Sequence, residues 1–353
     1  MDMLASLLHT TPAIAWMALK VVIVFGGVMS LAAVWTWVER RGSAMIQDRI
    51  GPNRARLFGR WPILGLAQIA ADGIKMFFKE DLVTTDANRR LFWLAPILAF
   101  VPALMGFAVI PFGKSFVSGG QTYHLALLDP GNGMGMLYPL AIGGMAVYGV
   151  LVAAWSSNNK WSILGGMRAS AAMVSYEIGL SLAVISIFMT TGGYDPAEII
   201  ASQSHLPWKW NVVPQLPGFI VFFTCMFAET NRLPFDFAEG ESEIVAGFNT
   251  EFGSMKFSLL ALAEYSHLMT ASALIATLYF GGWQVPFVKD PPVLLSVASF
   301  VLKLVFFAWV FVWIRWTLPR FRYDQLMHLG WKVMLPLSMA NLVFHAWRMS
   351  QGH

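Results

Sequence analysis

Long apolar segments recur along this chain, and short polar stretches separate them. About 20 apolar residues in a helix are enough to cross the ~30 Å hydrocarbon layer of a bilayer. Only 12% of the residues are charged, whereas a soluble domain has about 25%. The sequence therefore predicts an all-α polytopic membrane protein, with its helices packed as one bundle.

We interpret the apolar pattern as about eight spanning helices in a single membrane domain, residues 1–353. The first segment is too long for a cleavable signal sequence and ends in Glu39-Arg40-Arg41, so we expect it to span. The fifth is strongly apolar only from Pro217 to Ala228, which predicts a tilted helix or one shielded by neighbouring protein. The predicted spans are residues 14–38, 92–112, 136–156, 170–191, 212–229, 256–281, 292–314 and 331–348.

Lysine and arginine gather on alternate loops. Ten of them lie between the first and second spans, and others follow in the third, fifth and seventh loops. The opposite loops hold only Lys114, Lys209 and Lys289. Because cytoplasmic loops carry the excess of Lys and Arg, we expect the odd-numbered loops to face the cytoplasm and both termini to face outward.

The first loop contains a second kind of helix, predicted over about residues 62–79. Pro62 suits the first turn of a helix, and a segment of about 17 residues with several polar positions does not span. We expect this amphipathic helix to lie at the membrane interface. Its polar stripe is Gln68, Asp72, Lys75 and Lys79, and its apolar face is Leu66, Ala70, Gly73, Ile74 and Phe77.

An acidic stretch follows the fifth span and contains the run Glu239-Gly240-Glu241-Ser242-Glu243 beside Arg232. Crowded carboxylates repel one another, so some of them hold protons at neutral pH. Such a cluster next to a bilayer indicates a role in handling protons or a charge-coupled ligand. Its carboxylates are Glu229, Asp236, Glu239, Glu241 and Glu243.

Glu177, Glu264 and Lys303 lie well inside predicted spans, where a charge costs a few kcal/mol unless it is neutralised or paired. Glu177 is either a proton-relay site or a buried hydrogen-bonding group. Glu264 has the same two interpretations, and His267 is placed three residues further on to pair with it. Lys303, near the middle of its span, needs a carboxylate partner or a wet cavity.

The single cysteine, Cys225, excludes an internal disulfide, a cysteine-ligated iron–sulfur cluster and a thiolate zinc site. The sequence also lacks a P-loop, a glycine-rich dinucleotide turn and metal-ligand spacing. We therefore expect this chain to bind no metal and no redox cofactor of its own.

Several motifs together resemble the H-subunit family of proton-translocating NADH:quinone oxidoreductase, respiratory complex I. The resemblance extends from about residue 36 to 347, and its most specific parts are the acidic run and the last motif. The matching motifs are Glu39-Arg40, Gly51-Pro52-Asn53, residues 71–75, Arg168-Ala169, Ser175-Tyr176-Glu177, residues 228–243, Ala263-Glu264-Tyr265 and residues 319–327.

This resemblance implies a membrane subunit of a bacterial plasma (inner) membrane complex, in contact with lipid and with no nucleic acid. It would form much of the ubiquinone-access chamber at the junction with the peripheral arm, whose subunits carry FMN and the iron–sulfur clusters. Small membrane-arm subunits would be further partners. The quinone-binding residues implied are Glu39, Arg40, Leu66, Ala70, Asp72, Phe77 and Arg232. The proton path and coupling residues implied are Glu177, Glu229, Glu239, Glu241, Glu243, Glu264, Asp72 and Lys303.

Two alternatives remain at this point. One is the homologous membrane subunit of a membrane-bound hydrogenase or formate hydrogenlyase, which uses no quinone; the motifs at Gly51-Pro52-Asn53 and residues 319–327 favour complex I. The other is an autonomous ion transporter, for which internal repeats and broken spans at matching positions are typical. We find neither repeats nor such spans in the sequence.

Overall fold

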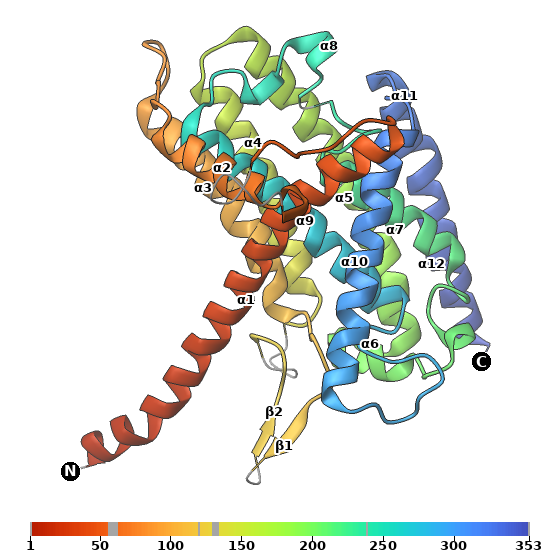
Figure 1. Cartoon of the computed structure of the whole chain (residues 1–353). Coiled ribbons are helices and arrows are strands. Elements are labelled where there is room, and N and C mark those ends of the chain that lie inside the picture. The colour runs from red at the N-terminus through yellow and green to blue at the C-terminus, as the bar shows by residue number, and fades with distance from the viewer. Residues whose placement is uncertain (1, 56–62, 119–120, 129–133, 238, 352–353) are drawn as a thin grey trace.

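The computed structural model describes residues 2–55, 63–118, 121–128, 134–237 and 239–351; within these ranges, the side chains of residues 2–16, 63, 116–118, 121–123 and 241–242 are not described. This part of the chain is almost entirely helical (Figure 1). Six helices are long and apolar enough to cross a membrane, which confirms the all-α polytopic class. They are α1 (Asp2–Ile46), α3 (Arg89–Met105, continued by the 3-10 turn η2, Gly106–Val109), α4 (Leu137–Ser156), α5 (Lys160–Thr191), α9 (Ser254–Tyr279) and α10 (Val293–Thr317).

Two shorter helices occupy the positions of the fifth and eighth predicted spans. The first is α7 (Leu216–Glu229), and the second is α12 (Leu335–Ser350), which continues from α11 (Tyr323–His328) through the π-helical turn η5 (Leu329–Met334). Neighbouring helices α5, α9 and α12 pack around α7. Of the two predicted possibilities for this short helix, the structure therefore shows shielding by neighbouring helices.

The first and fourth helices extend well beyond their predicted bounds. α1 continues past residue 38 to Ile46, and α5 begins at Lys160, ten residues before the predicted 170. The side chain of Asn159 caps α5 by accepting a hydrogen bond from the Trp161 N–H, and Gly192 ends it in the left-handed conformation with φ 76°. Apolarity alone cannot locate such ends, because the extra turns contain charged residues such as Arg40 and Arg168.

The interfacial helix is shorter than predicted. α2 covers Ala67–Phe78 and follows the 3-10 turn η1 (Ile63–Gly65), while Pro62 lies outside the described residues. The remaining elements are the small hairpin β1 (Phe116–Ser118) and β2 (Gln121–Tyr123), α6 (Pro196–Ser202), η3 (Pro207–Lys209), α8 (Glu241–Ile244) and η4 (Gly247–Asn249).

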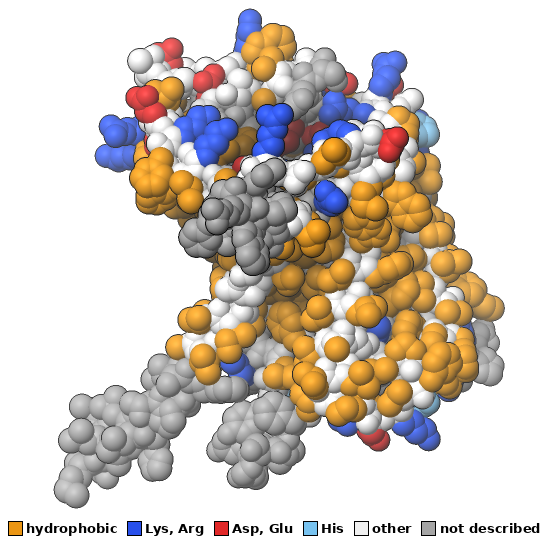
Figure 2. Space-filling view, in the orientation of Figure 1, with side chains coloured by type: hydrophobic (Ala, Val, Ile, Leu, Met, Phe, Trp, Pro, Cys, Tyr) orange, Lys and Arg blue, Asp and Glu red, His pale blue; other side chains and the backbone are white. Residues whose placement is uncertain are grey.

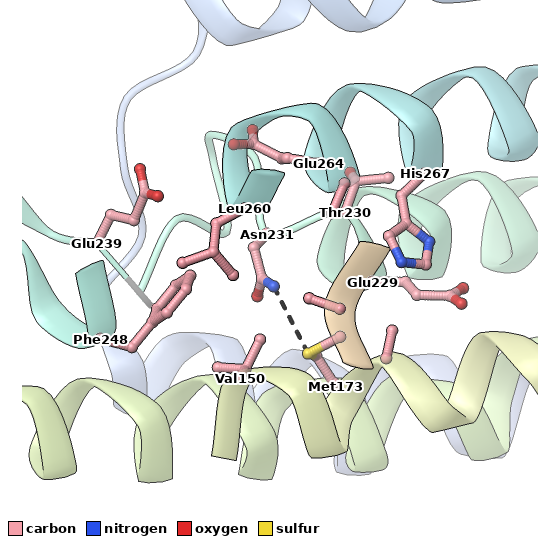
Figure 3. Close-up of a pocket in the computed structure, with 13 residues that line it drawn as sticks. Val150, Met173, Glu229, Thr230, Asn231, Glu239, Phe248, Leu260, Glu264 and His267 are labelled. Carbon is pink, nitrogen blue, oxygen red and sulfur yellow. Dashed lines mark hydrogen bonds between the residues drawn. The ribbon is translucent and has the colours of Figure 1, made fainter. Parts of the chain in front are cut away.

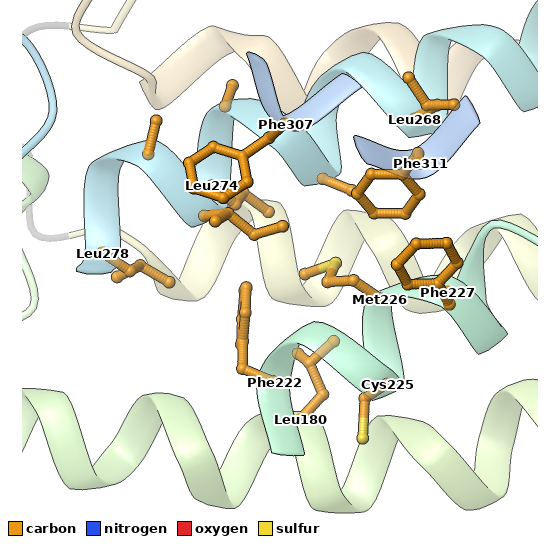
Figure 4. Close-up of a cluster of buried hydrophobic side chains, with 14 of the residues drawn as sticks. Leu180, Phe222, Cys225, Met226, Phe227, Leu268, Leu274, Leu278, Phe307 and Phe311 are labelled. Carbon is orange, nitrogen blue, oxygen red and sulfur yellow. The ribbon is translucent and has the colours of Figure 1, made fainter. Parts of the chain in front are cut away.

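The core lies between α5, α7, α9 and α10 and is rich in aromatic rings (Figure 4). Phe227 of α7 stacks on Phe311 of α10 with ring centroids 4.0 Å apart. α3 and α4 instead approach through small residues, because a Cβ on Gly149 would lie 2.6 Å from the Ala99 Cα. Small residues allow close helix contact where the hydrophobic effect between spans is weak.

Charged side chains gather at the end of the molecule that carries α2, α8 and α11, and orange apolar side chains cover the flanks below them (Figure 2). We call this the charged end. The hairpin and α6 lie at the opposite end (Figure 1).

Candidate functional site

Arg232 forms the centre of a buried charge cluster. Its side chain is fully buried, and Nη1 donates to Glu39 Oε2 on α1 at 2.6 Å. Its Nε lies 2.9 Å from Glu264 Oε1 on α9, and its guanidinium lies 4.5 Å from the centroid of the Tyr265 ring. The segment after α7 therefore joins α1 to α9 through a single guanidinium.

Arg315, in the last turn of α10, donates to the other carboxylate oxygen of Glu39. Glu39 thus lies between two guanidinium groups, and its side chain is only 6% exposed. Burial of a carboxylate is costly unless its oxygens are paired and hydrogen-bonded, and this arrangement meets that condition. We call Glu39, Arg232, Glu264 and Arg315 the charge cluster.

Two carboxylates of the acidic stretch lie beside the charge cluster. Glu239 accepts a hydrogen bond from Asn249 Nδ2, and Asp236 accepts one from Arg320 Nη2 at 2.9 Å. Burial, together with the charges of Glu264 and Asp236, raises the pKa of Glu239 to about 8. Glu239 is therefore mostly protonated at neutral pH, as expected for one member of a crowded carboxylate group.

A small cavity of about 50 Å³, lined by polar and apolar side chains together, lies between α3, α4, α5 and α9 (Figure 3). Its lining includes Glu229, Glu239, Glu264 and His267. A second cavity of about 20 Å³ shares Glu229, Thr230 and His267 with it. Because a water molecule needs roughly 10–15 Å³, the two volumes have room for about three waters and about one.

His267 lies where the two cavities meet. In Figure 3 its ring extends from α9 toward Glu229, which ends α7. Its Nε2 is buried and has no hydrogen-bond partner among the described residues. Glu264 pairs with Arg232, so the pairing of His267 with Glu264 that the sequence suggested is wrong.

Glu229 and Glu177 lie against two adjacent glycines of α4. A Cβ on Gly143 would be 2.7 Å from Glu229 Oε1, and one on Gly144 would be 2.5 Å from Glu177 Oε1. Real Cβ contacts are essentially never this short, so both positions require glycine for the carboxylates to stay in place. The carboxylates thus form a series from the charge cluster through the two cavities to α5.

A larger cavity of about 570 Å³ lies between α1, α2 and α9, and we call it the side cavity. One part of its wall is polar, because Arg40 pairs with Asp72, which also accepts from Gln68 Nε2 at 2.7 Å. Another part is apolar and includes Phe77. The sequence placed Leu66 and Ala70 on this surface, but neither lines the cavity. The residues that line it from α2 are Ile69, Asp72, Gly73, Lys75, Met76 and Phe77.

Tyr265 connects the side cavity to the charge cluster. Its side chain lines the side cavity, and its ring packs against the Arg232 guanidinium. Sequence reasoning assigned no role to Tyr265 or to Arg315. Arg315 was counted only in the loop charge that orients the bundle, and Tyr265 appeared only as the last residue of the matching motif Ala263-Glu264-Tyr265.

Some predicted site residues lie elsewhere. Glu243 pairs with Arg168 at 2.5 Å and is 41% exposed, and the side chain of Glu241 lies outside the described residues. The expectation of a carboxylate partner or wet cavity for Lys303 is wrong. Its Nζ donates to the carbonyl oxygens of Phe280, Gly282 and Gln284 at 2.8, 2.9 and 2.7 Å, and it lies over the Trp210 ring.

The sequence profile of the family described as NADH dehydrogenase matches residues 19–346. The chain belongs to the NADH dehydrogenase family. Its relatives include the NADH-quinone oxidoreductase H subunit of Leptospira biflexa serovar Patoc, 43% identical over 346 residues, which cover 94% of each chain. The protein of the same name from Rickettsia typhi is 45% identical over 329 residues, which cover 92% of this chain and 91% of the relative.

A third relative is the NADH-quinone oxidoreductase H subunit 1 of Cytophaga hutchinsonii, 44% identical over 319 residues, or 89% of this chain and 90% of the relative. These relatives confirm the resemblance to the H-subunit family that the sequence motifs indicated. Membership in this NADH dehydrogenase family makes the chain a membrane subunit of an enzyme complex.

Proposed function

We propose that this chain forms much of the ubiquinone-access chamber of a proton-translocating NADH:quinone oxidoreductase and couples quinone reduction to proton movement. The observation that carries the proposal is the contact of Tyr265 with both the side cavity and the charge cluster. A ligand in the side cavity is thereby separated from buried ionisable groups by a single aromatic side chain.

The side cavity suits a long-chain quinone. A long isoprenoid tail enters from the bilayer, and the cavity lies between α1 and the interfacial helix α2. Its volume of about 570 Å³ falls in the ~300–1,000 Å³ range of small-molecule sites. Arg40 and Asp72 provide polar groups for a headgroup, and Ile69, Met76 and Phe77 provide an apolar wall for the tail.

The carboxylate series provides the coupling. A change of charge in the side cavity alters the electrostatic balance of Arg232, and with it the protonation of its partners Glu39 and Glu264. Water in the two small cavities would connect Glu264 and Glu239 through His267 to Glu229. From Glu229 the series continues to Glu177, where a proton would leave toward the rest of the membrane arm.

The partners follow from the same proposal. The charged end faces the cytoplasm and binds peripheral-arm subunits, which hold FMN and the iron–sulfur clusters. Both termini then face outward across the bacterial plasma membrane. Helix contacts such as α3 with α4 and with α9 support one membrane domain over residues 1–353. Small membrane-arm subunits would cover part of the apolar flanks seen in Figure 2.

A matched pair of substitutions tests the quinone site. Gly73 lines the side cavity, and a Cβ added to it would meet nothing within 4 Å, whereas Ala70 lies on the same helix, is exposed and does not line the cavity. We expect Gly73→Leu to raise the KM for long-chain quinone at least severalfold and Ala70→Leu to leave it unchanged. Electron transfer from NADH to a hydrophilic acceptor at the peripheral arm should be the same in both variants.

The assay compares the two acceptors in membranes with equal amounts of assembled complex. Unchanged long-chain quinone kinetics in Gly73→Leu would contradict the proposed site. The hydrogenase alternative is tested with the same preparation, because that class would reduce protons to hydrogen and show no NADH-dependent quinone reduction. The names of the relatives support the oxidoreductase.

A further inference from the structure

A fourth cavity, of about 360 Å³, lies far from the charge cluster. It is enclosed by the outer half of α1, by α10 and by the segment between α3 and α4, toward the end of the molecule that carries the hairpin. Its walls are apolar and include Val28, Phe107, Phe300 and Leu304. The volume falls within the ~300–1,000 Å³ range of ligand sites. Neither the quinone site nor the carboxylate series uses it.

Backbone and side-chain contacts hold these walls together. The Phe112 N–H donates to the Leu125 carbonyl at 2.9 Å, which folds the segment back on itself. The Lys114 N–H donates to Ser296 Oγ at 3.1 Å and fastens this segment to α10. The cavity is therefore a preformed feature of the fold.

The exposed ion pair of Lys114 with Asp290, at 3.0 Å, marks the polar surface beside this cavity. Lys20 Nζ donates to the Ala126 carbonyl at 3.2 Å and ties α1 to the same segment. Lys20 is the first of the α1 residues that line the cavity, and those that follow it, from Ile23 to Leu31, are apolar.

The described lining contains two titratable side chains, Lys20 and His124, and both are basic. α1 contributes one wall, and only 11% of the residues in its most apolar window are buried, so this wall adjoins lipid. Basic side chains at the membrane interface attract anionic headgroups. We propose that this cavity binds an acyl chain of an anionic phospholipid, whose headgroup phosphate lies near Lys20 and His124.

Other occupants fit less well. A helix about 10 Å wide with a 5.4 Å pitch fills roughly 400 Å³ per turn, so the cavity holds less than one turn of a partner helix. A quinone headgroup carries no net charge, so the two basic side chains offer it hydrogen bonds but no ion pair. A single acyl chain is narrow and flexible, and a phospholipid has the anionic group that these side chains attract.

Two adjacent glycines of α1 provide a matched test. A Cβ on Gly26 or on Gly27 meets nothing within 4 Å, so both positions accept a larger side chain. Only Gly27 lines the cavity. Gly27→Leu therefore fills the cavity, and Gly26→Leu adds the same side chain outside it. For the headgroup, Lys20→Gln is compared with Lys209→Gln, an exposed lysine on η3.

The experiment uses the whole complex in nanodiscs that contain phosphatidylglycerol with a photoreactive acyl chain, or the matching phosphatidylcholine. After illumination, labelled peptides of α1 and α10 are quantified at subsaturating probe. In the parent protein, we expect the phosphatidylglycerol probe to label these peptides more than the phosphatidylcholine probe does. This comparison of the two lipids requires no substitution. Labelling should be largely lost in Gly27→Leu and fall about fivefold in Lys20→Gln, the factor equivalent to about 1 kcal/mol per lysine near a membrane surface.

Gly26→Leu and Lys209→Gln should label like the parent. Equal labelling by the two lipids in the parent, or equal labelling in the two glycine variants, would overturn the proposal. So would the absence of labelling in the parent, since it would mean that another subunit covers the cavity. NADH-dependent quinone reduction by Gly27→Leu is measured alongside to establish that the variant complex is assembled.

Discussion

Arg232 Nη1 donates to Glu39 Oε2 at 2.6 Å, and both side chains are buried. This contact joins the segment after α7 to α1. Because the same guanidinium also pairs with Glu264 and packs on Tyr265, it lies where a quinone-binding cavity and a series of carboxylates meet.

Arg232→Ala should destabilise the subunit strongly. The substitution leaves Glu264 without its ion pair and Glu39 with Arg315 alone, and breaking a buried pair costs about 3–5 kcal/mol. We expect a large loss of assembled complex after mild heating. Arg322→Ala is the control, since Arg322 is 79% exposed and its ion pair with Asp324 is worth about 0–1 kcal/mol. Equal thermal losses in the two variants would contradict a structural role for the charge cluster.

Glu239 should make the stability of the folded subunit depend on pH up to about pH 8. Its pKa is raised from an ordinary 4.5 to about 8, so between these values the folded subunit retains a proton that the unfolded chain releases. Stability attributable to this group is therefore greatest below pH 4.5 and declines as the pH rises to about 8. Glu239→Gln removes the group, so its stability should decline less than that of the parent over this interval.

The measurement is the thermal inactivation midpoint of the complex at pH 6 and pH 9. Glu243→Gln is the matched control, because Glu243 lies in the same stretch and is half-exposed. A Glu239→Gln profile that parallels the parent across this range would show that Glu239 ionises at an ordinary pH.

Gly143→Ala and Gly144→Ala should impair turnover by displacing carboxylates. The added methyl groups would lie 2.7 Å from Glu229 Oε1 and 2.5 Å from Glu177 Oε1, so each carboxylate has to move. We expect NADH:quinone turnover to fall about tenfold, equivalent to about 1.4 kcal/mol on the barrier. Gly26→Ala, where the added methyl meets nothing, should turn over like the parent. Turnover equal to that of the parent in both α4 variants would contradict a role for Glu177 and Glu229 in the proposed proton path.

Glu177→Gln keeps the shape of the side chain and removes its ionisable proton. We expect lower quinone reduction and lower proton pumping with normal assembly, measured in proteoliposomes at equal complex content. Glu198→Gln, at an exposed position of α6, should pump normally. If Glu177→Gln pumps like the parent, Glu177 is a buried hydrogen-bonding group, the other interpretation that the sequence allowed.

Much of the fold could be predicted because spanning helices have a clear length and polarity signal. Six of the predicted spans coincide with helices of spanning length. The short α7 was predicted to be tilted or shielded by neighbouring protein, and other helices do pack around it. The start of α5 depends instead on capping by Asn159, which apolarity does not reveal. The hairpin was not predicted, although the sequence between its strands, Gly119-Gly120, is a common two-residue turn signal.

The site was only partly predictable, because a single sequence does not show which distant charges meet. The acidic stretch and the charged positions within spans were visible, yet the partner of Glu264 proved to be Arg232 and not the nearby His267. Lys303 was interpreted as a functional charge, but its ammonium donates hydrogen bonds to backbone carbonyl oxygens. Every residue type has a backbone carbonyl, so the sequence does not show which of them will meet a lysine. Leu66 and Ala70 were misplaced because helix rotation was unknown.

The central claim is that quinone in the side cavity changes the protonation of buried carboxylates. Infrared difference spectroscopy on the complex, with and without a long-chain quinone, tests it most directly. We predict a change in the protonated-carboxyl band when quinone binds, which Glu239→Gln or Glu264→Gln removes or shifts and Glu198→Gln preserves. Quinone binding with no change in that band, or a change that persists in both Glu239→Gln and Glu264→Gln, would contradict the account.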